Sequence, residues 1–300
     1  MLKIAFHPAY NHPVPEGHRF PMLKYDLIAE QLVYEGTIAE SQLFSPERIL
    51  KSDLLRSHDS NYVQALDTLS LSPSDIRKTG FALTHELVMR EEIIMQGTID
   101  AAIHAAAFGI GMNIAGGTHH AYKEHGEGFC LYNDIILAAD YLLANTLAQK
   151  ILVVDLDVHQ GNGTAKMAQG NDAIFTFSMH GANNYPARKE QSNLDIALLD
   201  NTRDEAYLKA LSEILPKLID EVQPDHLFFQ SGVDVLATDK LGKLSLTRNG
   251  CKERDSIVLQ ACKLNKIPVT ISLGGGYSEN IIDIVEAHCN TFRLAQELYY

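Results

Sequence analysis

The sequence contains only four cysteines among 300 residues, and none of them form a Cys-x-x-Cys pair. They are Cys130, Cys251, Cys262 and Cys289. A chain of this length can bury a large core without covalent cross-links, which excludes a small scaffold held together by disulfides. We therefore expect reduced thiols and a cytoplasmic location.

Positive charge is also scarce, because Lys and Arg number 25 against 38 Asp and Glu, for a formal net charge of −13. A protein this acidic lacks the overall electrostatic footprint of a nucleic-acid binder or of a protein that binds anionic membranes. We therefore predict no direct nucleic-acid binding. This argument concerns the net charge of the whole chain, and a local patch of basic residues is compatible with that net charge.

Long apolar runs are absent as well. No run approaches the roughly 20 residues of a membrane-spanning helix, so we expect no membrane span. The apolar, β-branched runs are short and mostly bounded by Gly, Pro or polar residues, which is typical of parallel strands buried on both faces. They span residues 2–6, 113–115, 151–154, 173–177, 226–230 and 267–272.

Helical patterns lie between these predicted strands. Residues 22–34, 90–108 and 205–222 are the clearest, and Ser278 is suited to cap a last helix. Alternating strands and helices predict an α/β fold with a doubly wound parallel sheet, in which ligands bind beyond the carboxyl ends of the strands. The sequence has no linker, low-complexity tract or internal repeat, so we expect a single domain.

The densest group of polar residues follows the strand at 151–154 and has the sequence Asp-Leu-Asp-Val-His-Gln-Gly-Asn-Gly. Residues two apart in an extended chain face the same way, so Asp157 and His159 can converge on one ion, which suits Zn²⁺ or a neighbouring divalent metal. Asp234, after the strand at 226–230, could be the third of the three protein ligands that catalytic zinc sites typically hold. The alternative is that these aspartates only cap or turn the chain.

Two further strand ends carry chemistry-bearing side chains. His119 and His120 follow a Gly-Gly pair and could be acid/base groups or incidental polar residues of a loop. Three glycines precede Tyr277, and this segment could be a sharp turn, an anion cradle or a mobile loop. It is not a phosphate loop, because no Lys-Ser/Thr follows it. Together the four strand ends supply a metal site, a base and an oxyanion donor, which predicts metal-assisted hydrolysis of a carbonyl compound.

These motifs, in this order, resemble the zinc-dependent histone deacetylase family, within the arginase/deacetylase superfamily, and are most similar to its class IV branch and bacterial relatives. The resemblance covers nearly the whole chain and rests on residues 116–120, 128–130, 155–163, 234 with 239–242, and 274–277. It implies a three-layer α/β/α sandwich around a mostly parallel eight-stranded sheet. It also implies that residues 1–300 form a single histone-deacetylase-like catalytic domain.

The residues that match the family's catalytic machinery fall into three sets. The first set would hold one zinc ion: Asp157, His159 and Asp234. The second would act on the substrate: His119 with its partner Asp155, His120 with Asn162 where many relatives have Asp, and Tyr277 as the oxyanion donor. The third would line the acyl-lysine channel: Gly128, Phe129, Tyr185, Leu241 and Gly275. A structural potassium ion would lie near Asp155, Asp157, His159, Ser178 and Met179.

The resemblance implies a zinc-dependent amidohydrolase that removes an acetyl or longer acyl group from a lysine side chain or a related amine. Its partner would be an acyl-lysine protein or peptide, or an acylated small amine. Thr118 is smaller than an aromatic residue and would leave room for a longer acyl chain, whereas Arg19 near the pocket floor could contact leaving acetate.

Three alternatives stay open. An acylpolyamine or small-molecule deacetylase is one, although Leu241 stands where polyamine-specific relatives carry an acidic gatekeeper. A catalytically inactive acyl-lysine-binding protein is the second. An arginase-type ureohydrolase is the third, but it needs extra carboxylates for two manganese ions, and Val235 and Leu236 follow Asp234 instead.

Overall fold

The computed structural model describes all 300 residues, and its centre is an eight-stranded sheet in which every neighbouring pair of strands is parallel. The strand order is β2-β1-β3-β8-β7-β4-β5-β6. The strands are β1 Ile4–Ala5, β2 Leu43–Phe44, β3 Ile110–Asn113, β4 Ile151–Asp155, β5 Ile174–Gly181, β6 Leu194–Leu198, β7 His226–Gln230 and β8 Val269–Ser272. The predicted α/β fold with a parallel sheet is confirmed.

Five of the six apolar runs contain a strand, the sixth overlaps β3 only at Asn113, and the two strands that hydrophobicity missed are the edges of the sheet, β2 and β6. β2 is two residues long, and β6 has the sequence Leu-Asp-Ile-Ala-Leu with no fully buried residue. An edge strand is covered less completely than a central one, so its sequence lacks a continuous apolar run. The strand expected at 113–115 lies earlier, at Ile110–Asn113, because the preceding helix ends at Gly109 with a positive φ of 94°.

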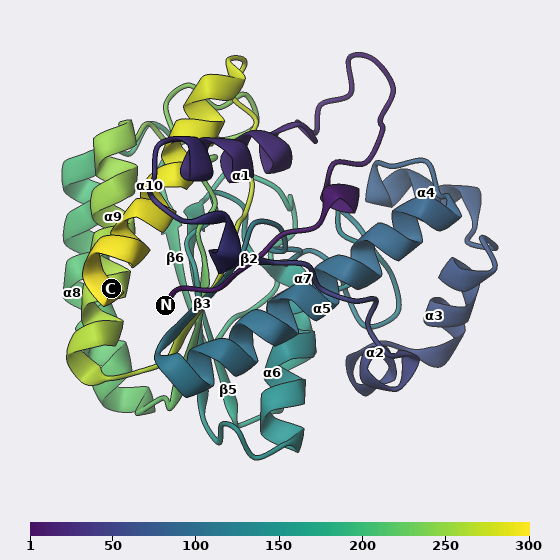
Figure 1. The fold of residues 1–300 in the computed structure, drawn as a ribbon, viewed down its shortest axis with the longest axis horizontal. Coiled ribbons are helices and arrows are strands. Elements are labelled where there is room, and N and C mark those ends of the chain that lie inside the picture. The colour runs from purple at the N-terminus through teal and green to yellow at the C-terminus, as the bar shows by residue number, and fades with distance from the viewer.

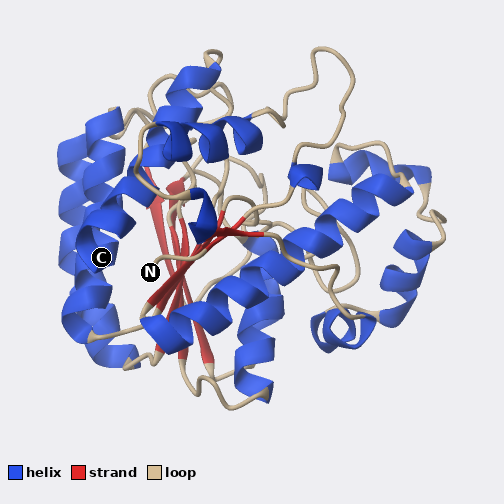
Figure 2. Ribbon diagram, viewed as in Figure 1, coloured by secondary structure: helices blue, strands red, loops and turns tan.

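Two layers of helices cover the sheet (Figure 1). Helices α8, α9 and α10 lie on one side of it, with α1 packed on α10, and α5, α6 and α7 lie on the other (Figure 2). Helices α2, α3 and α4 form an outer group beside α5 and α6. The helices are α1 Lys24–Tyr34, α2 Lys51–Ser57, α3 Ser60–Asp67, α4 Pro73–Thr79, α5 His85–Phe108, α6 Asp134–Ala144, α7 Asn162–Ala168, α8 Asp204–Val222, α9 Arg248–Asn265 and α10 Ile281–Tyr299, with 3₁₀ turns at Pro8–Tyr10 and Glu40–Gln42. No helix combines the length and hydropathy needed to cross a membrane.

The cap of the last helix differs from the prediction. Helix α10 begins after Asn280, whose side chain accepts a hydrogen bond from the Ile282 N–H, and not after Ser278. The Ser278 hydroxyl is engaged elsewhere, 2.9 Å from the Thr238 hydroxyl. Asn and Ser cap helices about equally well, so the sequence alone did not discriminate between two residues so close together. The four cysteines are unpaired and buried, as expected for structural thiols.

Candidate active site

The four strand ends that carry the predicted chemistry belong to four consecutive strands of the sheet, β3, β8, β7 and β4. His119 and His120 follow β3, Tyr277 follows β8, Asp234 follows β7, and Asp157 follows β4. Because all these strands are parallel, their carboxyl ends meet at one edge of the sheet. The sheet order therefore brings together side chains that are more than 150 residues apart in the chain.

Asp157, His159 and Asp234 form a buried cluster whose ligand atoms all lie within 4.8 Å of one another. The Nδ1 atom of His159 is 3.1 Å from Asp157 Oδ1 and 3.1 Å from Asp234 Oδ2. One imidazole nitrogen and two carboxylate oxygens are a ligand set that suits Zn²⁺ and leaves a coordination position open.

The electrostatics of this cluster favour a cation. Burial lowers the pKa of His159, but its hydrogen bonds to Asp157 and Asp234 and their charges outweigh burial and raise that pKa to about 10. Burial and the neighbouring Asp157 carboxylate raise the pKa of Asp234. Two buried carboxylates need a positive partner, and a metal ion in this position would replace the proton on His159.

Glycines allow the backbone to approach these carboxylates. The Gly275 N–H donates to Asp157 Oδ2 at 2.6 Å, and a Cβ added at Gly275 would overlap Asp234 Oδ2. A Cβ at Gly232 would likewise overlap Asp157 Oδ2. The Gly-rich segment after β8 is therefore not an anion cradle, since Gly274 and Gly275 are buried against carboxylates. Gly275, predicted to bind substrate, lies against the metal ligands and also lines the inner cavity, so its contact with substrate stays a prediction.

Two buried cations that the sequence analysis missed support the metal-binding loops. Arg254 on α9 is fully buried and donates to the carbonyls of Leu156 and Gly232, at 3.2 and 2.5 Å. Lys24 on α1 donates to the Gly274 carbonyl at 3.0 Å, and burial lowers its pKa to about 8. Neither residue lies in a motif, so nothing in the local sequence distinguishes it from a surface cation of a helix.

The two adjacent histidines have different partners and different charges. His119 Nδ1 is 2.7 Å from Asp155 Oδ2, and His120 Nδ1 is 2.6 Å from Asn162 Oδ1. Burial lowers the pKa of both rings, but the charges of Asp155 and Asp157 reverse the effect on His119 and raise its pKa. Burial lowers the pKa of His120 well below its ordinary value, and the charges on His119 and His159 lower it further. Protonation is therefore favoured on His119 and disfavoured on His120.

Glu127 fixes the orientation of Asn162, and sequence reasoning missed it. The Asn162 Nδ2 group donates to Glu127 Oε1 at 2.6 Å and to the Tyr122 hydroxyl at 3.0 Å, so its Oδ1 must face His120. His120 therefore carries its proton on Nδ1 and keeps a lone pair on Nε2. The Tyr185 hydroxyl also donates a hydrogen bond to Glu127 Oε1 at 2.7 Å. Its position directly before the Gly128-Phe129-Cys130 motif was the one available signal.

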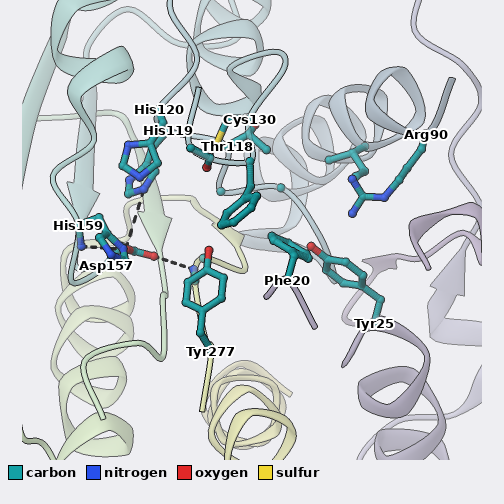
Figure 3. Close-up of a pocket in the computed structure, with 17 residues that line it drawn as sticks. Phe20, Tyr25, Arg90, Thr118, His119, His120, Cys130, Asp157, His159 and Tyr277 are labelled. Atoms are coloured by element: carbon teal, nitrogen blue, oxygen red, sulfur yellow. Dashed lines mark hydrogen bonds and ion pairs between the residues drawn. The ribbon is translucent and has the colours of Figure 1, made fainter. Parts of the chain in front are cut away.

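Tyr277 directs its hydroxyl towards the side of the cavity where Asp157 and His159 lie (Figure 3). Burial and the charges of Asp234 and Asp157 raise its pKa well above the ordinary value, so the phenol keeps its proton. The Tyr277 N–H donates to Asp239 Oδ2 at 2.6 Å, and the other oxygen of Asp239 accepts from two N–H groups of its own loop. This carboxylate ties the loop after β8 to the loop after β7.

An open cavity of about 350 Å³ leads from the surface to this cluster. Gly128, Phe129, Tyr185 and Leu241, the predicted channel residues, line it together with His120, His159 and Tyr277. Beyond them, a second cavity of about 30 Å³ lies between residues such as Phe20, Tyr25, Arg90 and Thr118. Arg19 is exposed at the outer cavity and not at the floor, so the role suggested for it with acetate is not supported.

The residues expected around potassium are close in the sheet. Asp155 on β4 pairs in register with Ser178 on β5, and Met179 follows Ser178 on the same strand. Asp155 Oδ1 already accepts the Asp157 N–H at 3.1 Å. The potassium ion itself stays a prediction.

Comparison with known proteins agrees with this geometry. Residues 18–292 match the histone deacetylase domain family. The chain is 40% identical to an uncharacterized protein of Picosynechococcus over 99% of both chains, and 26% identical to histone deacetylase 2 of Arabidopsis thaliana over 89% of this chain and 72% of that one. It is 27% identical to the acetoin utilization protein AcuC of Staphylococcus xylosus over 86% of this chain and 73% of that one. The crystal structure of the HDA15 HD domain shares the fold, with a TM-score of 0.81 and 21% identity over 99% of this chain and 92% of that one. The chain therefore belongs to the histone deacetylase domain family.

Proposed function

We propose that this chain is a zinc-dependent hydrolase that removes an acetyl group from a lysine side chain or a related amine. One observation carries the proposal: the buried cluster of Asp157, His159 and Asp234 shares a cavity with a neutral imidazole and a protonated phenol. Membership in the histone deacetylase domain family supports the deacetylase class. We further propose that residues 1–300 form a single catalytic domain and that the protein is cytoplasmic.

Asp157, His159 and Asp234 would hold the zinc ion, which when bound supplies a Lewis acid that polarises the substrate carbonyl and lowers the pKa of water. His120 takes a proton from the attacking water through its free Nε2 and later gives a proton to the nitrogen of the leaving amine. The water oxygen forms a new bond to the carbonyl carbon, and the bond between that carbon and the amine nitrogen then breaks. The products are acetate and a free amine. His119 keeps its proton and supplies positive charge, while the Tyr277 hydroxyl donates to the oxyanion that develops on the carbonyl oxygen.

The inner cavity supports acetyl over a long acyl chain. Its volume of about 30 Å³ is enough for only one or two water molecules. Thr118 lines this cavity and is held in place, because its hydroxyl and its N–H both donate to Asp134 Oδ1 at 2.8 Å. Longer acyl chains, which the class IV resemblance implied, would require movement of the side chains around this cavity.

One metal ion is favoured over the two of a ureohydrolase. The cluster contains three ligand residues, and Val235, one of the residues after Asp234, is buried and apolar. Asp155, a further carboxylate at this edge of the sheet, is engaged by His119 and by the Asp157 N–H. An inactive acyl-lysine-binding protein is not favoured, because His120 and Tyr277 are both present at the cavity.

The function is tested by metal analysis and by turnover of the same sample. We expect one zinc ion per chain, and one acetate released for each acetyl-lysine of the peptide that is converted to an unmodified lysine. Two manganese ions with release of urea from a guanidino compound would instead establish a ureohydrolase. Tight peptide binding without any product from zinc-loaded protein would establish an acyl-lysine-binding protein.

Adding potassium salts to desalted protein tests the expected potassium site. An increase in melting temperature with potassium is the expected result, because an ion that binds the folded state stabilises it.

We expect Glu127→Ala to lower kcat by roughly tenfold, because it removes a charge-assisted hydrogen bond that holds the Asn162 amide and so the tautomer of His120. Glu127→Gln should restore most of kcat, since both donors bind the same oxygen, Oε1, which glutamine retains. KM and zinc content should stay close to wild type in both variants. Steady-state kinetics with metal analysis provide the measurement.

Two further variants separate this role from a general effect on the loop. Glu124→Ala removes an exposed carboxylate of the same loop and should have little effect. Tyr185→Phe removes the second donor to Glu127 and should also leave kcat nearly unchanged. A wild-type kcat for zinc-loaded Glu127→Ala would show that Asn162 does not depend on Glu127.

A further inference from the structure

The outer cavity is lined by four cationic side chains and by no carboxylate. The four are Arg19, Arg77, Lys78 and Lys243, and all are exposed. The whole chain has 38 acidic and only 25 basic residues, so the entrance to the site carries charge opposite to that of the protein as a whole. We refer to these four residues as the basic rim.

Most of the basic rim lacks a counter-charge within the protein. Arg19, Arg77 and Lys243 form no ion pair, whereas Lys78 is 3.0 Å from Asp75 Oδ1 in an exposed pair that contributes little. A fifth cation, Lys189, lies close by, because its Nζ donates at 2.6 Å to the carbonyl of Asn184, which lines the outer cavity. Unpaired cations that gather around one opening produce a local positive potential, and this potential attracts anionic groups.

The rim cations are held in two separately anchored groups. Arg19 is next to His18, whose Nε2 is 2.9 Å from the carbonyl of Gly80, and this contact joins the N-terminal loop to the end of α4, where Arg77 and Lys78 lie. Lys243 belongs to the second group, and its backbone N–H donates to Asn184 Oδ1 at 3.2 Å. A small ligand with one anionic group would need only one of these groups. A peptide that crosses the opening would meet both.

We propose that the basic rim selects acyl-lysine peptide segments in which acidic residues flank the modified lysine. The proposal rests on the proposed deacetylase function and names its substrate class. The cavity that the rim surrounds reaches His120, His159 and Tyr277, so an anionic chain bound at the rim is already placed to insert its acyl-lysine. The same charges disfavour lysine- and arginine-rich segments and polyamines, which is consistent with the neutral Leu241 at this opening.

The test compares three peptides that differ only in the residues beside one acetyl-lysine: Asp/Glu, Ser/Gly or Lys/Arg. For zinc-loaded wild type at low salt we expect kcat/KM to be at least tenfold higher for the acidic peptide than for the basic one, mainly through KM. Salt of about 500 mM should remove most of the difference, because the Debye length then falls below the spacing of exposed charges. Fluorescence anisotropy of the same peptides measures binding without turnover.

A charge-reversed double variant, Arg77→Glu with Lys243→Glu, should reverse the peptide preference. The matched control is Lys209→Glu with Lys217→Glu, which changes the net charge equally on exposed positions of α8 and should keep the wild-type preference. Circular dichroism checks that both double variants fold.

The outcomes separate the rim from the proposed function. Turnover of all three peptides at equal kcat/KM would overturn the rim proposal and leave the deacetylase intact. Absence of turnover, together with tighter binding of the acidic peptide that the rim variant reverses, would overturn the deacetylase and leave the rim as a binding site. A preference that the α8 control alters as much as the rim variant would show an effect of net charge only and overturn the rim proposal.

Discussion

Zinc should be lost from Asp234→Ala, and with it all measurable deacetylation. Asp234 supplies one of three buried ligands, and partners outside the ligand shell of a zinc site already change affinity by roughly 10- to 100-fold, so removal of a ligand should cost roughly 100-fold or more. Elemental analysis of dialysed protein measures the loss directly. Zinc should also raise the melting temperature of the wild type but not of the variant, because an ion that binds only the folded state stabilises it.

Two variants guard against misfolding as an explanation. In the wild type the Val158 N–H donates to Asp234 Oδ1 at 2.9 Å. Asp234→Asn keeps the shape of the side chain and an oxygen that can accept this hydrogen bond, so the variant should fold and still bind zinc poorly. Asp172→Ala makes the alanine change at an exposed position and should retain zinc and activity. Full zinc occupancy in Asp234→Ala and Asp234→Asn would remove Asp234 from the metal site.

His120→Ala should lower kcat by roughly 10²- to 10⁴-fold while zinc stays bound. His120 is the imidazole that the structure keeps neutral and whose Nε2 is free, so it alone can accept a proton from water and return one to the amine. Asp155 raises the pKa of His119 and so favours its charged form, and loss of this ring removes positive charge without removing the base, so His119→Ala should be impaired less. Single-turnover kinetics at matched zinc loading measure both effects.

Added imidazole extends this test. It should restore part of the activity of His120→Ala, because a free base can occupy the space that the ring leaves beside Gly128, whose added Cβ would meet that ring. It should not restore Asp234→Ala, which lacks the metal. If His119→Ala is the more damaged variant at equal zinc content, the roles assigned to the two histidines must be exchanged.

Local sequence was sufficient for the central part of the fold. The runs at 151–154 and 226–230 became β4 and β7 with nearly unchanged bounds, because strands buried on both faces must be apolar throughout. The spacing of Asp157 and His159 predicted that both would reach one ion, and the structure brings them within 3.1 Å of each other, although in a bend after β4 and not in extended chain. The family motifs depended on such short segments too, and they led to the histone deacetylase family before any geometry was known.

Only the tertiary structure decided which distant residues act together. The sheet order β3-β8-β7-β4 brought the histidines, Tyr277 and the metal ligands to one edge, and no local pattern specifies that order. Glu127 could not be assigned from the sequence, because its role consists of a contact with Asn162 across 35 residues. The basic rim has the same origin. Its residues at 19, 77, 78 and 243 are unremarkable in a sequence with a net charge of −13, and they acquire a common role only because separate loops meet around one opening. Periodicity and spacing record the short-range geometry of the backbone, whereas long-range proximity depends on how the whole chain packs.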